Sequence, residues 1–270
     1  MIGRNRKTPE MAISEAELSS MTSDLDMLHR ETFPGVTKTL DDFSANIAHL
    51  VTKEPTGRRN FLAGVGGLLV VGTVAACSSS SKTPSSSSRP AASSSGATSG
   101  TSKYTGDLRV VALAAALENL AVAAYGMALT AAAAGTYGTV PPAVATFVQT
   151  AMKQHSDHAQ AWNGVLTKAN LPAITGTPLS IAAGEVGMLK AAKSIPDVAT
   201  VALNLEIAAA DTYTFAAANV SDAGGIMTAA TIQPVETMHA AILSFVLGQY
   251  PVPLAFIGID KAVMPSAFTG

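Results

Sequence analysis

The feature that most constrains the fold is an internal repeat in the second half of the chain. Residues 117–125 read Leu-Glu-Asn-Leu-Ala-Val-Ala-Ala-Tyr, and residues 205–213 read Leu-Glu-Ile-Ala-Ala-Ala-Asp-Thr-Tyr. Later segments share two dipeptides at identical offsets: His158-Ala159 with Val165-Leu166, and His239-Ala240 with Val246-Leu247. The matching glutamates are 88 residues apart and the matching histidines 81, so one structural unit occurs twice.

Each copy of this unit is predicted to be a pair of α-helices. Alanine, the best helix former, supplies much of the 48% hydrophobic content, while aromatic residues make up only 5%. Prolines and glycines mark the helix ends, and Pro234 is expected to kink or split the last helix. The expected long helices span 107–134, 141–168, 196–219 and 221–249, with a short one over 181–193. Two hairpins joined by a long crossover predict an all-α four-helix bundle.

The few ionisable residues within these apolar helices occur at ordered spacings. Glu236 and His239 are three residues apart in one helix, and His155 and His158 have the same spacing in another. Side chains three residues apart lie on one face of a helix, one turn from each other. Each pair can therefore reach one metal ion, or two adjacent ions.

The other two helices each carry a glutamate followed by a tyrosine seven residues later. Glu118 precedes Tyr125, and Glu206 precedes Tyr213. Because seven residues make nearly two helical turns, each tyrosine shares the face of its glutamate. The tyrosines are either hydrogen-bond partners that orient the glutamates or ordinary core aromatics.

A duplicated hairpin with a glutamate on its first helix and a Glu-x-x-His on its second resembles the ferritin-like di-iron carboxylate family. The resemblance covers about residues 105–250. It implies two metal ions, iron first, although Mn and Zn also suit oxygen and imidazole ligands. It implies chemistry of the oxidase, peroxidase or ferroxidase type in stress protection. The implied ligands are Glu118, Glu206, Glu236, His158 and His239.

The sequence departs from the family at His155, where a glutamate that bridges the two metals is expected. With His155 as a sixth ligand, three carboxylates and three imidazoles surround the site. Two divalent ions then bring a charge of +4 against -3, so a hydroxide, a water-derived ligand or a single metal becomes the better match.

A second interpretation is a ferritin-like lipoprotein with a degenerate site, acting as a binding or structural module without catalysis. Its polar groups would bind one another and no metal. Whether the chain is an enzyme is left open by the sequence, as is its oligomeric state, a homo-oligomer included. A storage cage fits a tethered protein poorly. The net charge of -2 offers no basic surface for nucleic acid.

An export signal is predicted over residues 57–77. Arg58 and Arg59 precede 16 uncharged, mostly apolar residues (61–76), which lead into Cys77, the single cysteine. The arginine pair resembles a twin-arginine signal, and the Val-Ala-Ala-Cys that ends the run resembles a bacterial lipobox. These resemblances imply twin-arginine export machinery as a partner and a lipid anchor on Cys77 at the outer face of the membrane. The alternative is an uncleaved anchor helix, although a span needs about 20 residues.

The segments around the signal and the bundle are predicted from composition. Residues 1–56 are polar and charged, and they are expected to be mostly disordered, with a short helix near 40–51. Residues 78–104 are rich in serine and cannot bury enough apolar surface to order, so they are expected to be a flexible tether. The bundle then spans 105–250, and 251–270 form a C-terminal tail.

Overall fold

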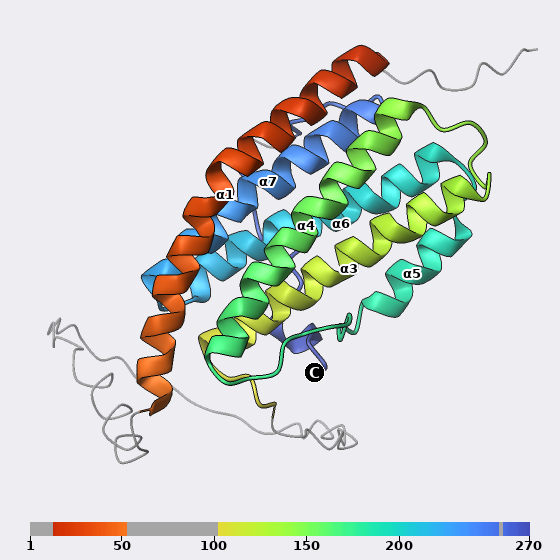
Figure 1. Cartoon of the computed structure of the whole chain (residues 1–270). Coiled ribbons are helices and arrows are strands. Elements are labelled where there is room, and N and C mark those ends of the chain that lie inside the picture. The colour runs from red at the N-terminus through yellow and green to blue at the C-terminus, as the bar shows by residue number, and fades with distance from the viewer. Residues whose placement is uncertain (1–12, 53–101, 254–255) are drawn as a thin grey trace, which may run out of the picture.

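The computed structural model describes residues 13–52, 102–253 and 256–270. Throughout these residues the regular structure is helical, which confirms the predicted all-α class (Figure 1). The short 3-10 turn η2 spans Pro265–Ala267. The α-helices are α1 (Glu15–Thr52), α3 (Asp107–Ala133), α4 (Pro142–Lys168), α5 (Ala182–Ala191), α6 (Ile195–Asn219) and α7 (Ala223–Val246).

Four of these helices, α3, α4, α6 and α7, form the bundle. α3 packs on α4 and α6 packs on α7, and the short α5 lies in the crossover beside α3 (Figure 1). Pro142 begins α4, and the Asp222 carboxylate caps α7 by accepting from the amides of Gly224 and Gly225. α7 runs unbroken through Pro234, so the expected split at that residue is wrong.

α3 is the central helix of the bundle. Within the described residues it is the one helix long and apolar enough to cross a membrane, with a mean hydropathy of 1.7. However, 67% of that apolar stretch is buried inside the protein. Its small side chains, Ala112, Ala115 and Ala116, are fully buried and let the neighbouring helices approach closely. Its composition is therefore accounted for by its place in the core.

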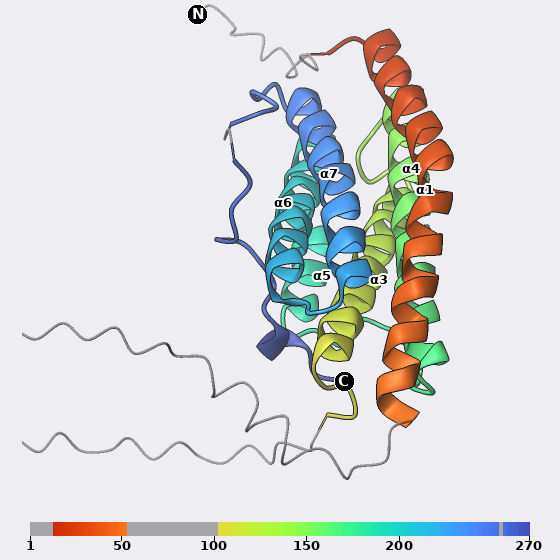
Figure 2. The ribbon, with the colours of Figure 1, turned by 90° about the vertical axis from the view of Figure 1, so that its left-hand side faces the viewer.

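The expectation that residues 1–56 are mostly disordered is wrong for the 38 residues of α1. α1 lies along α4 and α7 as a fifth helix on the outside of the bundle (Figure 2). Most of its buried residues recur every three or four positions, which places them on one stripe of the helix. Three of them, Thr22, His29 and Ser44, are polar, so hydropathy alone hides the stripe. The buried set is Leu18, Thr22, Leu25, His29, Val36, Leu40, Phe43, Ser44 and Ile47.

α1 comes close to the bundle at the beginning of α7. A Cβ atom on Gly224 would lie 3.0 Å from the carbonyl oxygen of Thr39 and 3.1 Å from the Cβ of Phe43. Nearby, Asn46 Nδ2 donates a hydrogen bond to Asp222 Oδ2 at 2.9 Å. The absence of a side chain at Gly224 therefore allows α1 to sit in this position.

The described part of the C-terminal tail, residues 256–270, runs back along the bundle (Figure 2). The amide of Lys261 donates to Asp211 at 2.8 Å, and the amide of Val263 donates to Thr212 at 2.8 Å, so α6 holds the tail. The predicted signal over 57–77, with its arginine pair and its cysteine, lies outside the described residues.

Candidate metal centre

Six ionisable side chains from four helices meet in the middle of the bundle. Each is 2% exposed or less, although ionisable groups are rarely buried to this extent without a partner. The structure thus brings all six predicted ligand residues to one interior point. They are Glu118 from α3, His155 and His158 from α4, Glu206 from α6, and Glu236 and His239 from α7.

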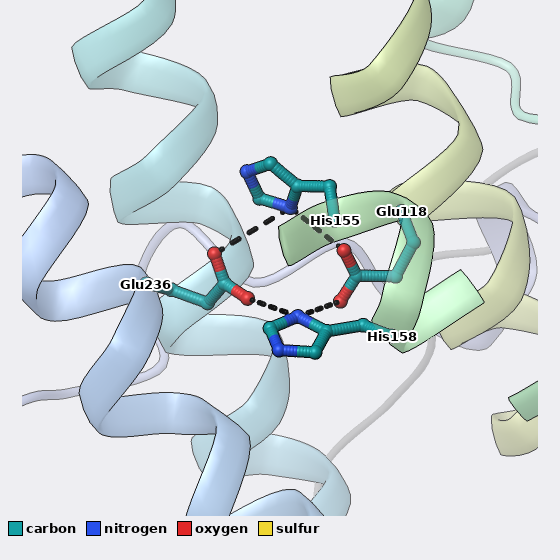
Figure 3. Close-up of side chains that lie close together, drawn as sticks. All are labelled: Glu118, His155, His158 and Glu236. Carbon is teal, nitrogen blue, oxygen red and sulfur yellow. Dashed lines mark hydrogen bonds and ion pairs between the residues drawn. The ribbon is translucent and has the colours of Figure 1, made fainter. Parts of the chain in front are cut away.

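Four of the six form a first group around two carboxylates (Figure 3). His158 Nδ1 lies 3.2 Å from Glu236 Oε1 and 3.5 Å from Glu118 Oε1. His155 Nδ1 lies 2.7 Å from Glu118 Oε2 and 3.7 Å from Glu236 Oε2. Both rings turn a nitrogen into the space between the carboxylates.

A second group of four shares His155 and Glu236 with the first. His239 Nδ1 lies 3.3 Å from Glu206 Oε2 and 3.3 Å from Glu236 Oε2. His155 Nε2 lies 3.1 Å from Glu206 Oε1. Glu236 therefore turns one oxygen to each group, and His155 turns one ring nitrogen to each.

The electrostatics of the first group favour ionised side chains. Burial alone would raise the pKa of Glu118, but the charge of His158 and the hydrogen bond from His155 lower it to about 2. Burial alone would lower the pKa of His158, but the charge of Glu118 and the neighbouring Glu236 raise it to about 9. Near neutral pH this metal-free pair is an imidazolium facing a carboxylate.

The same balance holds in the second group. Burial opposes the charged forms, but the charges of Glu206 and Glu236 raise the pKa of His155 well above its usual value. The pKa of His239 is also raised, chiefly by the charge of Glu206. In return, the two histidines hold the pKa of Glu206 well below its ordinary range. The histidines and glutamates of this group therefore stabilise each other's charged forms.

The two predicted tyrosine partners cross between the halves of the bundle. Tyr125 on α3 donates to Glu206 on α6, and Tyr213 on α6 donates to Glu118 on α3. Trp162 Nε1 in turn donates to the Tyr213 oxygen at 2.9 Å. Each tyrosine shares the face of its own helix's glutamate but orients the glutamate of the opposite helix.

Two further residues contact the centre, and neither was predicted from the sequence. Gln154 Oε1 lies 2.8 Å from His239 Nε2, and His29 Nε2 on α1 lies 3.2 Å from His158 Nε2. Burial, with the charge of His158, lowers the pKa of His29 to about 4, so its ring is neutral. The buried stripe of α1, on which His29 falls, is the signal that could have found it.

The donor set fits a metal ion by chemistry and by spacing. Among the described residues, four buried side-chain polar atoms lack a hydrogen bond, and two of them, His158 Nδ1 and Glu236 Oε1, face each other here. Adjacent ligands on an ion with bonds of about 2.1 Å lie roughly 3 Å apart. The separations between the nitrogens and oxygens, 2.7 to 3.7 Å, lie around that value.

A small apolar pocket of about 40 Å³ lies beside the second group. Its lining comes mostly from alanine, valine and leucine side chains, and Tyr125 and Glu206 are the polar residues among them. Its apolar wall suits a small apolar molecule such as dioxygen better than water, which needs polar partners. The pocket thus offers a small molecule a place next to Glu206.

A helical bundle with an interior cluster of glutamates and histidines defines a class of metal-binding four-helix proteins. A family model described as "Ferritin-like domain" matches residues 106–249, which is more than half of the chain. The chain therefore belongs to the ferritin-like domain family. No curated protein and no solved structure matches it significantly.

Proposed function

We propose that this chain is an extracytoplasmic ferritin-like protein that binds two metal ions, iron first, at the six-residue centre. Iron held there would supply redox chemistry with dioxygen or peroxide, of the oxidase, peroxidase or ferroxidase type. One observation carries the proposal: the two groups of donors share His155 and Glu236, so two adjacent positions are framed by one continuous set of side chains. Protection against oxidative stress is the role that such chemistry would serve.

The residues of the chain have separate parts in this proposal. Glu118 and His158 would hold an ion at one position, and Glu206 and His239 would hold an ion at the other. His155 and Glu236 belong to both groups. Tyr125 and Tyr213 orient the glutamates through their hydrogen bonds. The surrounding helices bury the centre, and an apolar pocket lies beside Glu206.

Metal analysis of the purified full-length chain tests the proposal. After anaerobic incubation with Fe²⁺ and gel filtration, we expect between one and two ions per chain. The double variant Glu236→Ala, His239→Ala should lose them. Less than about 0.2 ion per chain in the wild type would reject the metal-binding function, because ligands of this kind retain metal through such a step.

A second candidate function has an observation in its favour. Histidines and glutamates lie against one another in the centre, where they raise the pKa of His155 and lower those of Glu118 and Glu206, so these side chains stabilise one another without a metal. On this alternative the chain is a non-catalytic binding or structural lipoprotein. The same metal analysis separates the two, since the alternative predicts no retained iron and a variant that changes only stability.

Export and anchoring at Cys77 are also proposals, supported by the arginine pair, the apolar run and the lipobox-like end of that run. They have a consequence for the fold, because α1 precedes the predicted signal and yet packs on the bundle. Cleavage before Cys77 would remove α1 from the protein. Mass spectrometry of the membrane fraction decides this: an acylated N-terminal Cys77 supports the proposal, and an intact N-terminus contradicts cleavage.

A further inference from the structure

The last histidine of each pair has the same orientation in both halves of the centre. His239 turns Nδ1 toward the carboxylates, and its Nε2 faces Gln154 Oε1 at 2.8 Å. His158 also turns Nδ1 toward the carboxylates, while its Nε2 faces His29 Nε2 at 3.2 Å (Figure 3 shows the inward nitrogen of His158). The two halves differ in what accepts the outer proton.

This outer contact determines which nitrogen of the ring is available to a metal. An imidazole that binds through Nδ1 carries its proton on Nε2, and that proton needs an acceptor when the ring is buried. For His239 the acceptor is an amide oxygen on the same helix as His155. For His158 it is Nε2 of the His29 ring, which can accept the proton when His29 carries its own proton on Nδ1.

We propose that His29 is a positioning residue of this centre, whose Nε2 accepts the His158 proton and fixes His158 Nδ1 toward Glu118 and Glu236. The inference rests on the proposed metal-binding function and adds a residue from outside the matched family region, 106–249. In the uncleaved chain, α1 therefore contributes a residue that positions a ligand of the centre.

The surroundings of His29 hold its ring in place. His29 is 5% exposed and stacks on Phe33, with ring centroids 4.8 Å apart and planes at 18°. Phe33 also contacts His158, with centroids 5.7 Å apart, so the three rings form one cluster. α1 supports the other half as well, because Gln154 Nε2 donates to the carbonyl oxygen of Leu25 at 3.4 Å.

A matched pair of substitutions in the full-length chain isolates the acceptor. His29→Gln keeps an acceptor oxygen, as Gln154 does for His239, whereas His29→Met has a similar length and no comparable acceptor. Thr22→Val is the control, since Thr22 is buried on the same helix and bonds only the carbonyl of Leu18. Co²⁺ is the probe, because its visible absorption reports both affinity and ligand geometry.

We expect His29→Met to weaken Co²⁺ binding about 10- to 100-fold and to alter the Co²⁺ spectrum, as loss of an outer hydrogen-bond partner does. His29→Gln should restore most of the affinity and the wild-type spectrum, and Thr22→Val should change neither. Thermal unfolding of each metal-free variant, measured in parallel, shows how much of any change reflects the fold.

Two results would overturn the inference and leave the proposed function standing: wild-type affinity in His29→Met, or equally weak binding in His29→Gln and His29→Met. A wild-type chain that binds neither Co²⁺ nor Fe²⁺ would instead reject the proposed function, and this inference with it. The two failures are therefore distinguishable.

Discussion

The two halves of the bundle are built on the same plan and differ at one position in the centre. Both supply an inward glutamate, a tyrosine that crosses to the other half, and a histidine with Nδ1 turned inward. The second half also supplies Glu236, where the first has His155. Because these are the two residues shared by both ligand groups, this single difference sets the charge of the whole centre.

The difference changes the balance between acidic and basic groups in the centre. With a glutamate at both shared positions, four carboxylates would face two histidines. With His155, three of each are present, and the glutamates raise the pKa of all three histidines. Metal ions and protons therefore compete for the same side chains, so metal binding should release protons.

Removing the shared carboxylate should have the largest effect. Glu236→Gln keeps the shape of the side chain but takes a ligand from both groups, so we expect metal affinity to fall by more than about 100-fold, the upper end for loss of an outer partner. Glu118→Gln affects one group only and should leave one ion bound. Isothermal titration with Fe²⁺ measures both, and Glu185→Gln, on α5, is the control. Equal losses in Glu118→Gln and Glu236→Gln would contradict the shared role.

Making the two halves alike should have the next largest effect on metal binding and stability. His155→Glu restores the fourth carboxylate, so we expect two ions per chain and tighter binding. In the metal-free protein the added charge is buried without compensation, which should lower the free energy of unfolding by roughly 3 to 5 kcal/mol. Urea unfolding with and without Mn²⁺ measures both effects. An unchanged metal-free stability would show that His155 does not balance the carboxylates.

The stability of the metal-free protein should depend on pH in a defined window. His158 has a folded pKa of about 9 against an ordinary 6.5, so its contribution is complete below pH 6.5 and is lost as pH rises through 9. Glu118 has a folded pKa of about 2 against 4.5, so its contribution is complete above pH 4.5 and is lost as pH falls through 2.

We therefore expect stability to be greatest near pH 6.5. It should fall by roughly 3 kcal/mol as pH rises through 9, because of His158, and it should also fall below pH 6.5, because the folded pKa of His29 is about 4. Urea unfolding of the chelator-treated protein across this range measures it. The variant His158→Gln should lack the alkaline decline. A wild-type profile that is flat from pH 6.5 to 9 would argue against a protonated His158.

The crossed tyrosines should give the smallest effects and should not be equal. Tyr125→Phe and Tyr213→Phe each remove one hydrogen bond to a glutamate, at a cost of about 1 to 2 kcal/mol in stability. Tyr213→Phe should cost more, because Trp162 Nε1 then loses its acceptor as well. Thermal unfolding of the two variants compares them, and a larger loss in Tyr125→Phe would contradict the assigned contacts.

Much of the bundle and its centre could be predicted because the repeat encodes both. Glu236 and His239, three residues apart, specify a helix face, and the matching Glu118 and Glu206 specify the helices opposite. The contact of each tyrosine with the other half could not be predicted, since helical spacing describes one helix at a time. α1 was not predicted because Thr22 and His29 interrupt its apolar stripe. The contact of His29 with His158 was therefore not predicted either.

A crystal structure of the full-length chain soaked anaerobically with Fe²⁺ tests the central claim most directly. We expect anomalous density among Glu118, His155, His158 and Glu236, and among His155, Glu206, Glu236 and His239. Six side chains paired only with one another, with no anomalous density among them, would contradict it.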